Sequence, residues 1–133
     1  MPTTLLSQHP YLLLFAGTLG LLPLSIGTLG LLHPSSGWTI FNLPKPSTPS
    51  AQKVGEDFFL FWASRDVFMG LVTSAAWYHG DRKMMGYVMF MATMVGVVDG
   101  VMSRRVKGNG EWVHWGFVPV LGAVGGGLVG WWD

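Results

Sequence analysis

The chain carries the run YLLLFAGTLGLLPLSIGTLGLL at residues 11–32, which is 22 residues long and holds no charge. A helix of about 20 apolar residues is long enough to cross the hydrocarbon core of a bilayer, which is roughly 30 Å thick. No lysine or arginine precedes the run and no small-residue cleavage site closes it. We therefore interpret it as a retained membrane span and not as a cleaved signal peptide.

The composition points the same way. Of the 133 residues, 50% are hydrophobic and only 11% are charged, whereas a soluble domain carries about 25% charged residues. The net charge of +1 gives no support for a nucleic-acid partner. The absence of cysteine excludes disulfides, thiolate catalysis and thiolate metal sites.

Three further apolar stretches follow, at about 57–78, 84–102 and 112–132. Together with the first run they predict an all-α integral membrane four-helix bundle, a single multi-pass domain over residues 1–133. Residues 33–56 are rich in proline and serine, which predicts a long loop without helix.

Basic residues are shared unequally between the two sides of this topology. The connections after the first and third spans carry five of them, Lys45, Lys53, Arg104, Arg105 and Lys107. The connection between the second and third spans carries two, Arg82 and Lys83. Because cytoplasmic loops are enriched in lysine and arginine, the first side is expected to face the cytoplasm.

Small residues recur at helical spacing in the last two spans. Gly96 and Gly100 form one pair four residues apart, and Gly122, Gly126 and Gly130 form a longer stripe. Such stripes let helix backbones approach closely in lipid. We expect them to pack within the bundle, and a homodimer through the last-span stripe is the alternative.

No cofactor or metal is expected. The third span contains five methionines, which we interpret as pliable packing and not as a soft metal site, since clustered histidine is missing. They are Met84, Met85, Met89, Met91 and Met94.

Four ionisable residues stand out because they fall within the predicted spans. Arg65 and Asp66 lie inside the second span, Asp99 lies near the exit of the third, and His114 lies near the entry of the fourth. A charge at such depth costs at least about 2.5–3.5 kcal/mol, so it requires a partner or a function. In a four-span topology these residues occupy the same half of the bilayer.

The four residues form a candidate catalytic set for proton transfer. Asp66 and Asp99 would exchange protons, Arg65 would stabilise developing negative charge, and His114 would assist. The alternative is a structural ion-pair network that sets the register of the helices. Adjacent residues on a helix point about 100° apart, so Arg65 is expected to pair across helices more readily than with Asp66.

The pattern resembles a family of short four-span membrane proteins of fungi and bacteria, known as a domain of unknown function. The resemblance covers about residues 15–130 and rests on the following residues: Phe41-Asn-Leu-Pro44, Arg65-Asp66 with Gly70, then Gly86, Asp99 and His114. The family pattern has a glycine where this chain has Asn42.

Fungal members of that family often accompany natural-product pathways. The resemblance therefore implies a role on a lipophilic small molecule, such as isomerisation or cyclisation by acid–base chemistry without a cofactor. The alternative is a non-catalytic membrane scaffold or accessory subunit whose polar cluster only holds the helices together. The lipid bilayer is the expected partner in either case.

Overall fold

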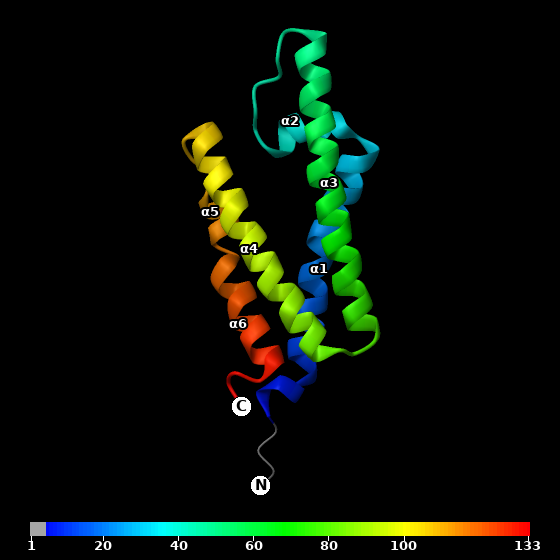
Figure 1. Ribbon diagram of the computed structural model, residues 1–133, viewed down its shortest axis with the longest axis vertical. Coiled ribbons are helices and arrows are strands. Elements are labelled where there is room, and N and C mark those ends of the chain that lie inside the picture. Colours follow the sequence, from blue (N-terminus) through cyan, green and yellow to red (C-terminus); the bar gives the residue numbers. More distant parts are fainter. Residues whose placement is uncertain (1–4) are drawn as a thin grey trace. The chain divides into compact units, whose positions relative to one another are not determined.

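The computed structural model describes residues 5–133, and these residues form helices and turns without a strand (Figure 1). In chain order the elements are η1 (Leu6–Gln8), α1 (Pro10–Leu32), η2 (Pro34–Ser36), α2 (Gly37–Ile40), α3 (Pro49–Tyr78), α4 (Arg82–Lys107), α5 (Trp112–Trp115) and α6 (Val118–Val129). The predicted all-α fold class is confirmed.

The chain divides into two compact units. Residues up to Leu19 belong with Val72–Asp133 in the first unit, and Gly20–Leu71 form the second. The beginning of α1 and the end of α3 therefore contribute to the first unit together with α4, α5 and α6. The remainder of α1 and of α3 contribute to the second unit together with α2.

Three helical stretches among the described residues are long and apolar enough to cross a membrane, namely α1, α4 and residues 112–129. They correspond to three of the four predicted spans. The second predicted span lies in α3, which is 30 residues long and carries Arg65 and Asp66 in its interior. Helix α4 also carries an interior charge, Asp99, whereas α1 carries none.

The prediction of a loop without helix at 33–56 is wrong in two places. Residues 49–56 belong to α3, which begins at Pro49, and residues 34–40 form η2 and α2. Proline suits the first helical position because its missing N–H has no intrahelical partner there. The first turn is closed by Gln52, whose amide N donates to Thr48 O at 3.1 Å and whose side chain donates to Pro46 O at 2.7 Å.

The predicted span at 112–132 is interrupted and ends early. Helices α5 and α6 are separated by two residues, and Pro119 lies in the first turn of α6. Gly130 ends α6 with φ of 89°, and the amide N of Trp131 donates to Gly126 O at 2.9 Å. A glycine in this conformation with such a bond is a Schellman motif, which stops a helix.

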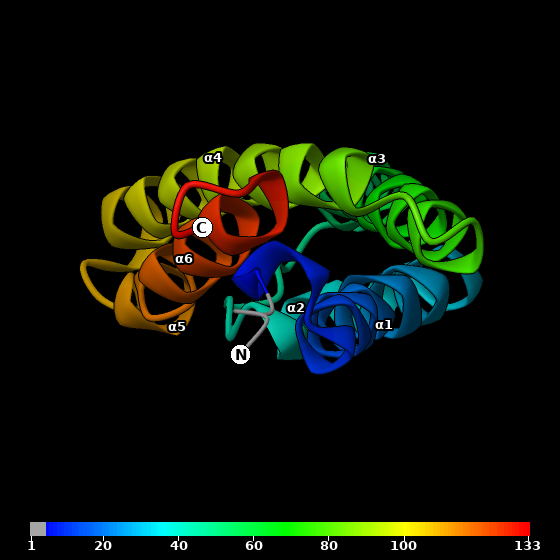
Figure 2. The same ribbon diagram turned by 90° about the horizontal axis from the view of Figure 1, so that it is seen from below.

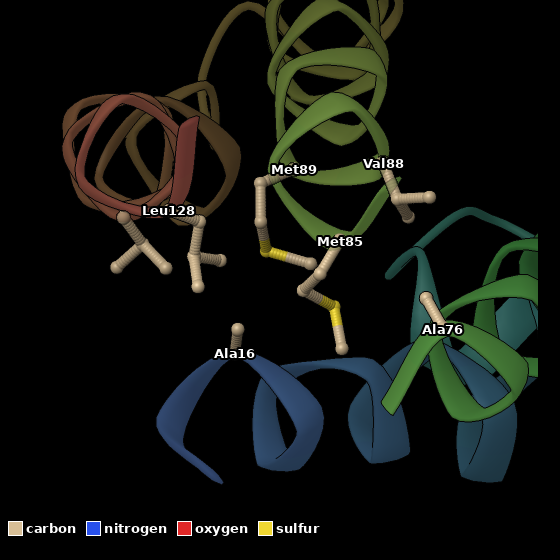
Figure 3. Packing of buried hydrophobic residues seen from close by; sticks show 7 residues of the cluster. Ala16, Ala76, Met85, Val88, Met89 and Leu128 are labelled. Carbon is tan, nitrogen blue, oxygen red and sulfur yellow. The ribbon is translucent and has the colours of Figure 1, made fainter. Parts of the chain in front are cut away.

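The core of the first unit contains apolar side chains from α1, α3, α4 and α6. The buried members are Ala16, Ala76, Met85, Val88, Met89, Val124 and Leu128. Figure 3 shows the side chains of Met85 and Met89 lying between Leu128 of α6 and Ala16 of α1. The packing interpretation is thus confirmed for these two methionines. Three others are exposed on the protein surface: Met84, Met91 and Met94.

Helices α4 and α6 lie side by side in both views (Figures 1 and 2) and approach closely at glycines. A Cβ added at Gly125 would lie 3.1 Å from Gly86 O. The predicted stripe does not form this contact. Gly122 faces open space, and a Cβ at Gly126 would meet the rings of the two tryptophans that follow α6. The packing face is turned by one residue, so the interpretation of the stripe as one packing surface is wrong.

This geometry predicts different outcomes for two glycines of α6. Gly125→Leu is expected to lower the free energy of unfolding by about 1–3 kcal/mol, because the added atoms have to displace the α4 backbone. Gly122→Leu is the matched control and should unfold like the parent chain. Thermal unfolding in detergent, followed by circular dichroism, measures both. Equal melting temperatures for the two variants would contradict the assigned packing face.

In the second unit, α1 and α3 run antiparallel and touch through glycines. A Cβ at Gly27 would lie 2.8 Å from Ala63 O, and a Cβ at Gly70 would lie 2.8 Å from the Cα of Leu24. Gly30 lies against the Ala63 side chain in the same way. Gly27 and Gly30 are therefore packing positions, where the missing side chains let α1 and α3 approach closely.

Segment 5–9 is tied to the rest of the first unit by polar contacts. The amide N of Ser7 donates to Asp133 Oδ1 at 2.9 Å, and Arg82 Nη1 donates to the carbonyl oxygens of Ser7 and His9 at 3.0 and 3.1 Å. Hydrogen bonds from the hydroxyl and amide of Ser7 hold the pKa of the Asp133 carboxyl below its usual value. The contact therefore persists across the neutral pH range.

Candidate functional site

The four candidate residues are divided between the two units. Arg65 and Asp66 lie in α3 of the second unit, whereas Asp99 in α4 and His114 in α5 belong to the first. The structure therefore places each pair within its own unit. A site that combines all four residues stays a prediction from topology.

Arg65 and Asp66 form an ion pair with each other. Arg65 Nη2 lies 3.0 Å from Asp66 Oδ1 and Nε lies 3.2 Å from the same oxygen. Arg65 thus reaches its neighbour in the sequence although the two side chains leave the helix about 100° apart. The three methylene groups of arginine let the guanidinium swing around the helix to reach the next residue.

The two partners of this pair differ in how far the protein covers them. The Asp66 side chain is 13% exposed, whereas that of Arg65 is 33% exposed. Asp66 lies against α1, since a Cβ at Gly27 would be 3.0 Å from Asp66 Cβ. The pair thus presents a covered carboxylate and a cation that another molecule can reach. The sequence signal for this contact is Gly27, which the sequence interpretation does not connect with Asp66.

An aromatic cluster adjoins the pair in the second unit. Phe41 packs against Trp62 and Phe59 with ring centroids 4.6 and 5.5 Å apart, and Trp38 meets Phe59 edge-on at 4.8 Å. Trp62 lies four residues before Asp66, and residues spaced in this way share one face of a helix. The Trp62 end of the cluster therefore lies about one turn from Asp66, and the Phe59 end about two turns from it.

Two polar atoms in this region are buried without a hydrogen-bond partner. They are the indole N–H of Trp38 and the hydroxyl of Ser36, among the residues that the structure describes. Most buried polar groups in proteins are paired, so an unpaired one requires an explanation. Both atoms can donate a hydrogen bond to an oxygen of a bound molecule. The sequence interpretation does not include Trp38 or Phe41 among the candidate site residues.

In the first unit, Asp99 and His114 lie on segments that touch. A Cβ at Gly96 would lie 3.7 Å from His114 O. Gly100 lies beneath the Trp115 ring, whose Nε1 donates to Val97 O at 3.2 Å. Asp99 is therefore held on a turn of α4 that packs against α5, and both candidate side chains are half-buried.

Comparison with known protein families identifies one match. The family described as "Domain of unknown function (DUF4267)" matches residues 20–128. The chain belongs to this family. No curated protein and no solved structure matches the chain.

The DUF4267 match covers both units and every candidate residue, and it confirms the resemblance to a family of unknown function. Asn42 has φ of 50°, in the left-handed region that glycine adopts freely and asparagine tolerates. The turn of this family member therefore has the backbone geometry that a glycine would also provide.

A second ion pair lies at the turn between α4 and α5 of this DUF4267 chain. Arg104 Nη1 lies 3.3 Å from Glu111 Oε1, and the Glu111 side chain is only 12% exposed. The sequence interpretation counts Arg104 as a topological charge and assigns Glu111 no partner. It did not predict their pairing, which requires the reversal of the chain after Lys107.

Proposed function

We propose that the chain is an integral membrane protein in which α3 crosses the bilayer along with α1, α4 and residues 112–129. The support is the packing in the second unit. Helix α1 is long and apolar enough to span. Helix α3 runs antiparallel to α1, because Gly70 lies against Leu24 and Ala63 lies against Gly30. A helix that packs side by side with a span has to enter the same membrane.

The same packing sets the depth of the ion pair. Asp66 lies opposite Gly27, which is five residues from the end of α1 at Leu32. With a rise of about 1.5 Å per residue, Asp66 is about 8 Å inside the end of that span. Arginine can extend its charged head over part of such a distance toward the interface. This depth makes a charged pair tolerable and leaves it accessible from the membrane.

The topology is testable because the chain has no cysteine. Ser50→Cys and Asn109→Cys, placed singly, are expected to resist an impermeant thiol reagent added outside the cell, because five basic residues mark that side as cytoplasmic. Both sites should react after permeabilisation, which serves as the control. Labelling of both from outside would reverse the orientation. Labelling of only one would contradict four spans.

Within this membrane protein, we propose that the second unit binds a lipophilic small molecule and that the Arg65–Asp66 pair acts on it by acid–base chemistry. The observation that carries this proposal is the pair of unpartnered donors, Trp38 N–H and Ser36 O–H. Trp38 belongs to an aromatic cluster whose other end, at Trp62, lies about one turn from Asp66. Aromatic walls with a few placed polar groups are typical of small-molecule sites.

The proposed roles follow from the exposure of the two side chains. Asp66, ionised beside Arg65, would take a proton from carbon next to a carbonyl group and return it elsewhere in an isomerisation or cyclisation. The more exposed Arg65 would stabilise the developing oxyanion. Asp99 and His114 are further candidates for proton transfer, and the substrate would be a natural-product intermediate. The chemistry proposed for these side chains requires no cofactor.

A scaffold or accessory subunit is the second candidate. The observation in its favour is that Arg65 and Asp66 satisfy each other's charge within one turn of α3. Such a pair stabilises a structure without any reaction.

Substitution of the carboxylates separates these functions. Asp66→Asn keeps the size and polarity of the side chain and removes its titrating proton. We expect near-parental protein levels but loss of the associated metabolic step, seen by comparing metabolites of the native host carrying parent, variant or no gene. Asp99→Asn and His114→Gln are tested in the same way.

Ser64→Ala is the matched control, since Ser64 is the exposed neighbour of the pair on α3. Full function of both Asp66→Asn and Asp99→Asn would contradict the catalytic proposal. Loss of protein in Asp66→Asn that Arg65→Leu restores would support the scaffold.

A further inference from the structure

The turn between α4 and α5 is an ordered polar segment that the proposed reaction does not use. Gly108 has φ of 75° and its amide N donates to Arg104 O at 2.8 Å. Ser103 Oγ donates to Asn109 O at 3.3 Å, and the Arg104–Glu111 pair joins the end of α4 to the start of α5. These bonds hold the backbone and the charged side chains of residues 103–112 together.

Positive charge is in excess at this turn. Its cations are Arg104, Arg105 and Lys107, and its one carboxylate is Glu111. The Arg104 side chain stays 63% exposed although it is paired, and Arg105 is exposed as well. Lys107 Nζ lies over the turn, 3.1 Å from where a Cβ of Gly110 would be. Three basic groups therefore surround one short loop, and one acid neutralises only part of their charge.

Exposed apolar side chains flank the same turn. Val106 on α4 and Trp112 with Val113 on α5 are exposed, and Trp112 is 73% exposed. Tryptophan with an uncovered ring is typical of the headgroup level of a bilayer. The basic loop thus lies between apolar groups that enter the membrane surface.

The basic residue Arg82 at the other end of α4 is bound differently, so exposed positive charge is not a general property of the ends of this helix. There Arg82 donates to the carbonyl oxygens of Ser7 and His9, so the protein itself takes up its charge. Cations in the last turn do stabilise the helix dipole. The dipole does not account for the exposed tryptophan beside them.

We propose that the α4–α5 turn, residues 103–112, binds the headgroup of an anionic phospholipid. Arg105 and Lys107 contact the phosphate, and Trp112 lies in the adjoining interfacial layer. Arg104 positions the loop through Glu111. The inference rests on the proposed membrane location of the chain. It agrees with the expected cytoplasmic side, where anionic lipids are enriched.

The test uses the full chain in phosphatidylcholine nanodiscs with spin-labelled lipids, either phosphatidylglycerol or phosphatidylcholine, at low salt. The parent chain should immobilise phosphatidylglycerol about tenfold more strongly, since each basic residue near the surface contributes to the attraction. Arg105→Gln/Lys107→Gln should abolish the preference and leave the circular dichroism spectrum unchanged. Lys53→Gln/Lys83→Gln removes the same charge elsewhere and should keep the preference.

Several outcomes would overturn the inference. An equal loss in both double variants would assign the effect to net charge, and displacement of the lipid by inorganic phosphate would assign it to a free anion. Incorporation of the parent chain without any lipid preference would refute the headgroup site alone. Failure of the chain to remain in carbonate-washed membranes would instead refute the proposed membrane location.

Discussion

Gly27→Leu is expected to lower the free energy of unfolding by about 3 kcal/mol, near the upper end of what overpacking usually costs. A Cβ at this position would lie 2.7 Å from the amide N of Val67 and 2.8 Å from Ala63 O. Both are backbone atoms, so no side-chain rotation relieves the clash and α1 has to separate from α3. Leucine itself is favourable in lipid, and the loss is therefore steric.

The control for this variant is Thr28→Leu, which adds a similar side chain at the next residue, on the exposed face of α1. Equilibrium unfolding by sodium dodecyl sulfate in mixed micelles, followed by circular dichroism, measures both variants. Because Gly27 also lies against Asp66, Gly27→Leu should uncover the ion pair and impair the proposed activity. Equal stability of the two variants would contradict the α1–α3 packing.

Arg65→Leu is expected to destabilise the protein by about 3–5 kcal/mol, the usual cost of removing one partner of a buried ion pair. The Asp66 side chain is 13% exposed, and the variant removes the ion-pair partner that Arg65 provides. The double variant Arg65→Leu/Asp66→Leu should recover most of this loss, because two apolar side chains do not require each other. Asp66→Leu alone should cost less, since the 33% exposed Arg65 can turn toward the interface.

Unfolding of the four species in mixed micelles gives the coupling energy of the pair directly. Ser64→Leu is the control for added bulk on the same turn. Additive effects of the two single variants would mean that Arg65 and Asp66 do not stabilise one another. That result would contradict the scaffold function.

Three apolar helical stretches could be predicted from local composition. The apolar runs at 11–32, 84–102 and 112–132 each correspond to a helical stretch that is long and apolar enough to span. Helix α3 begins eight residues before its predicted start. Proline breaks a helix in its interior, but Pro49 occupies the first helical position, where proline is favourable. Helix α6 ends earlier than predicted because Gly130, which the sequence interpretation assigns to helix packing, caps the helix instead.

The charged residues of the candidate site could be predicted from the sequence, whereas the side chains packed around them could not. Arg65 and Asp66 stand out in any apolar stretch, because charges are costly there. Their mutual pairing depends on the arginine rotamer, which the order of residues does not specify. The donors on Ser36 and Trp38 were missed for a related reason, since burial without a partner is a property of the packed structure.

The order of residues is enough to predict that this chain forms apolar helices and to identify the ionisable residues within them. Helix formation and membrane partition depend on residues near one another in the chain, so local composition suffices. Which glycines face a neighbouring helix, Gly27 and Gly125 and not Gly122, follows from the packed fold alone. That choice depends on the rotation and register of two helices distant in sequence. Because Asp66 lies opposite Gly27, the same register decides how deeply the carboxylate is covered.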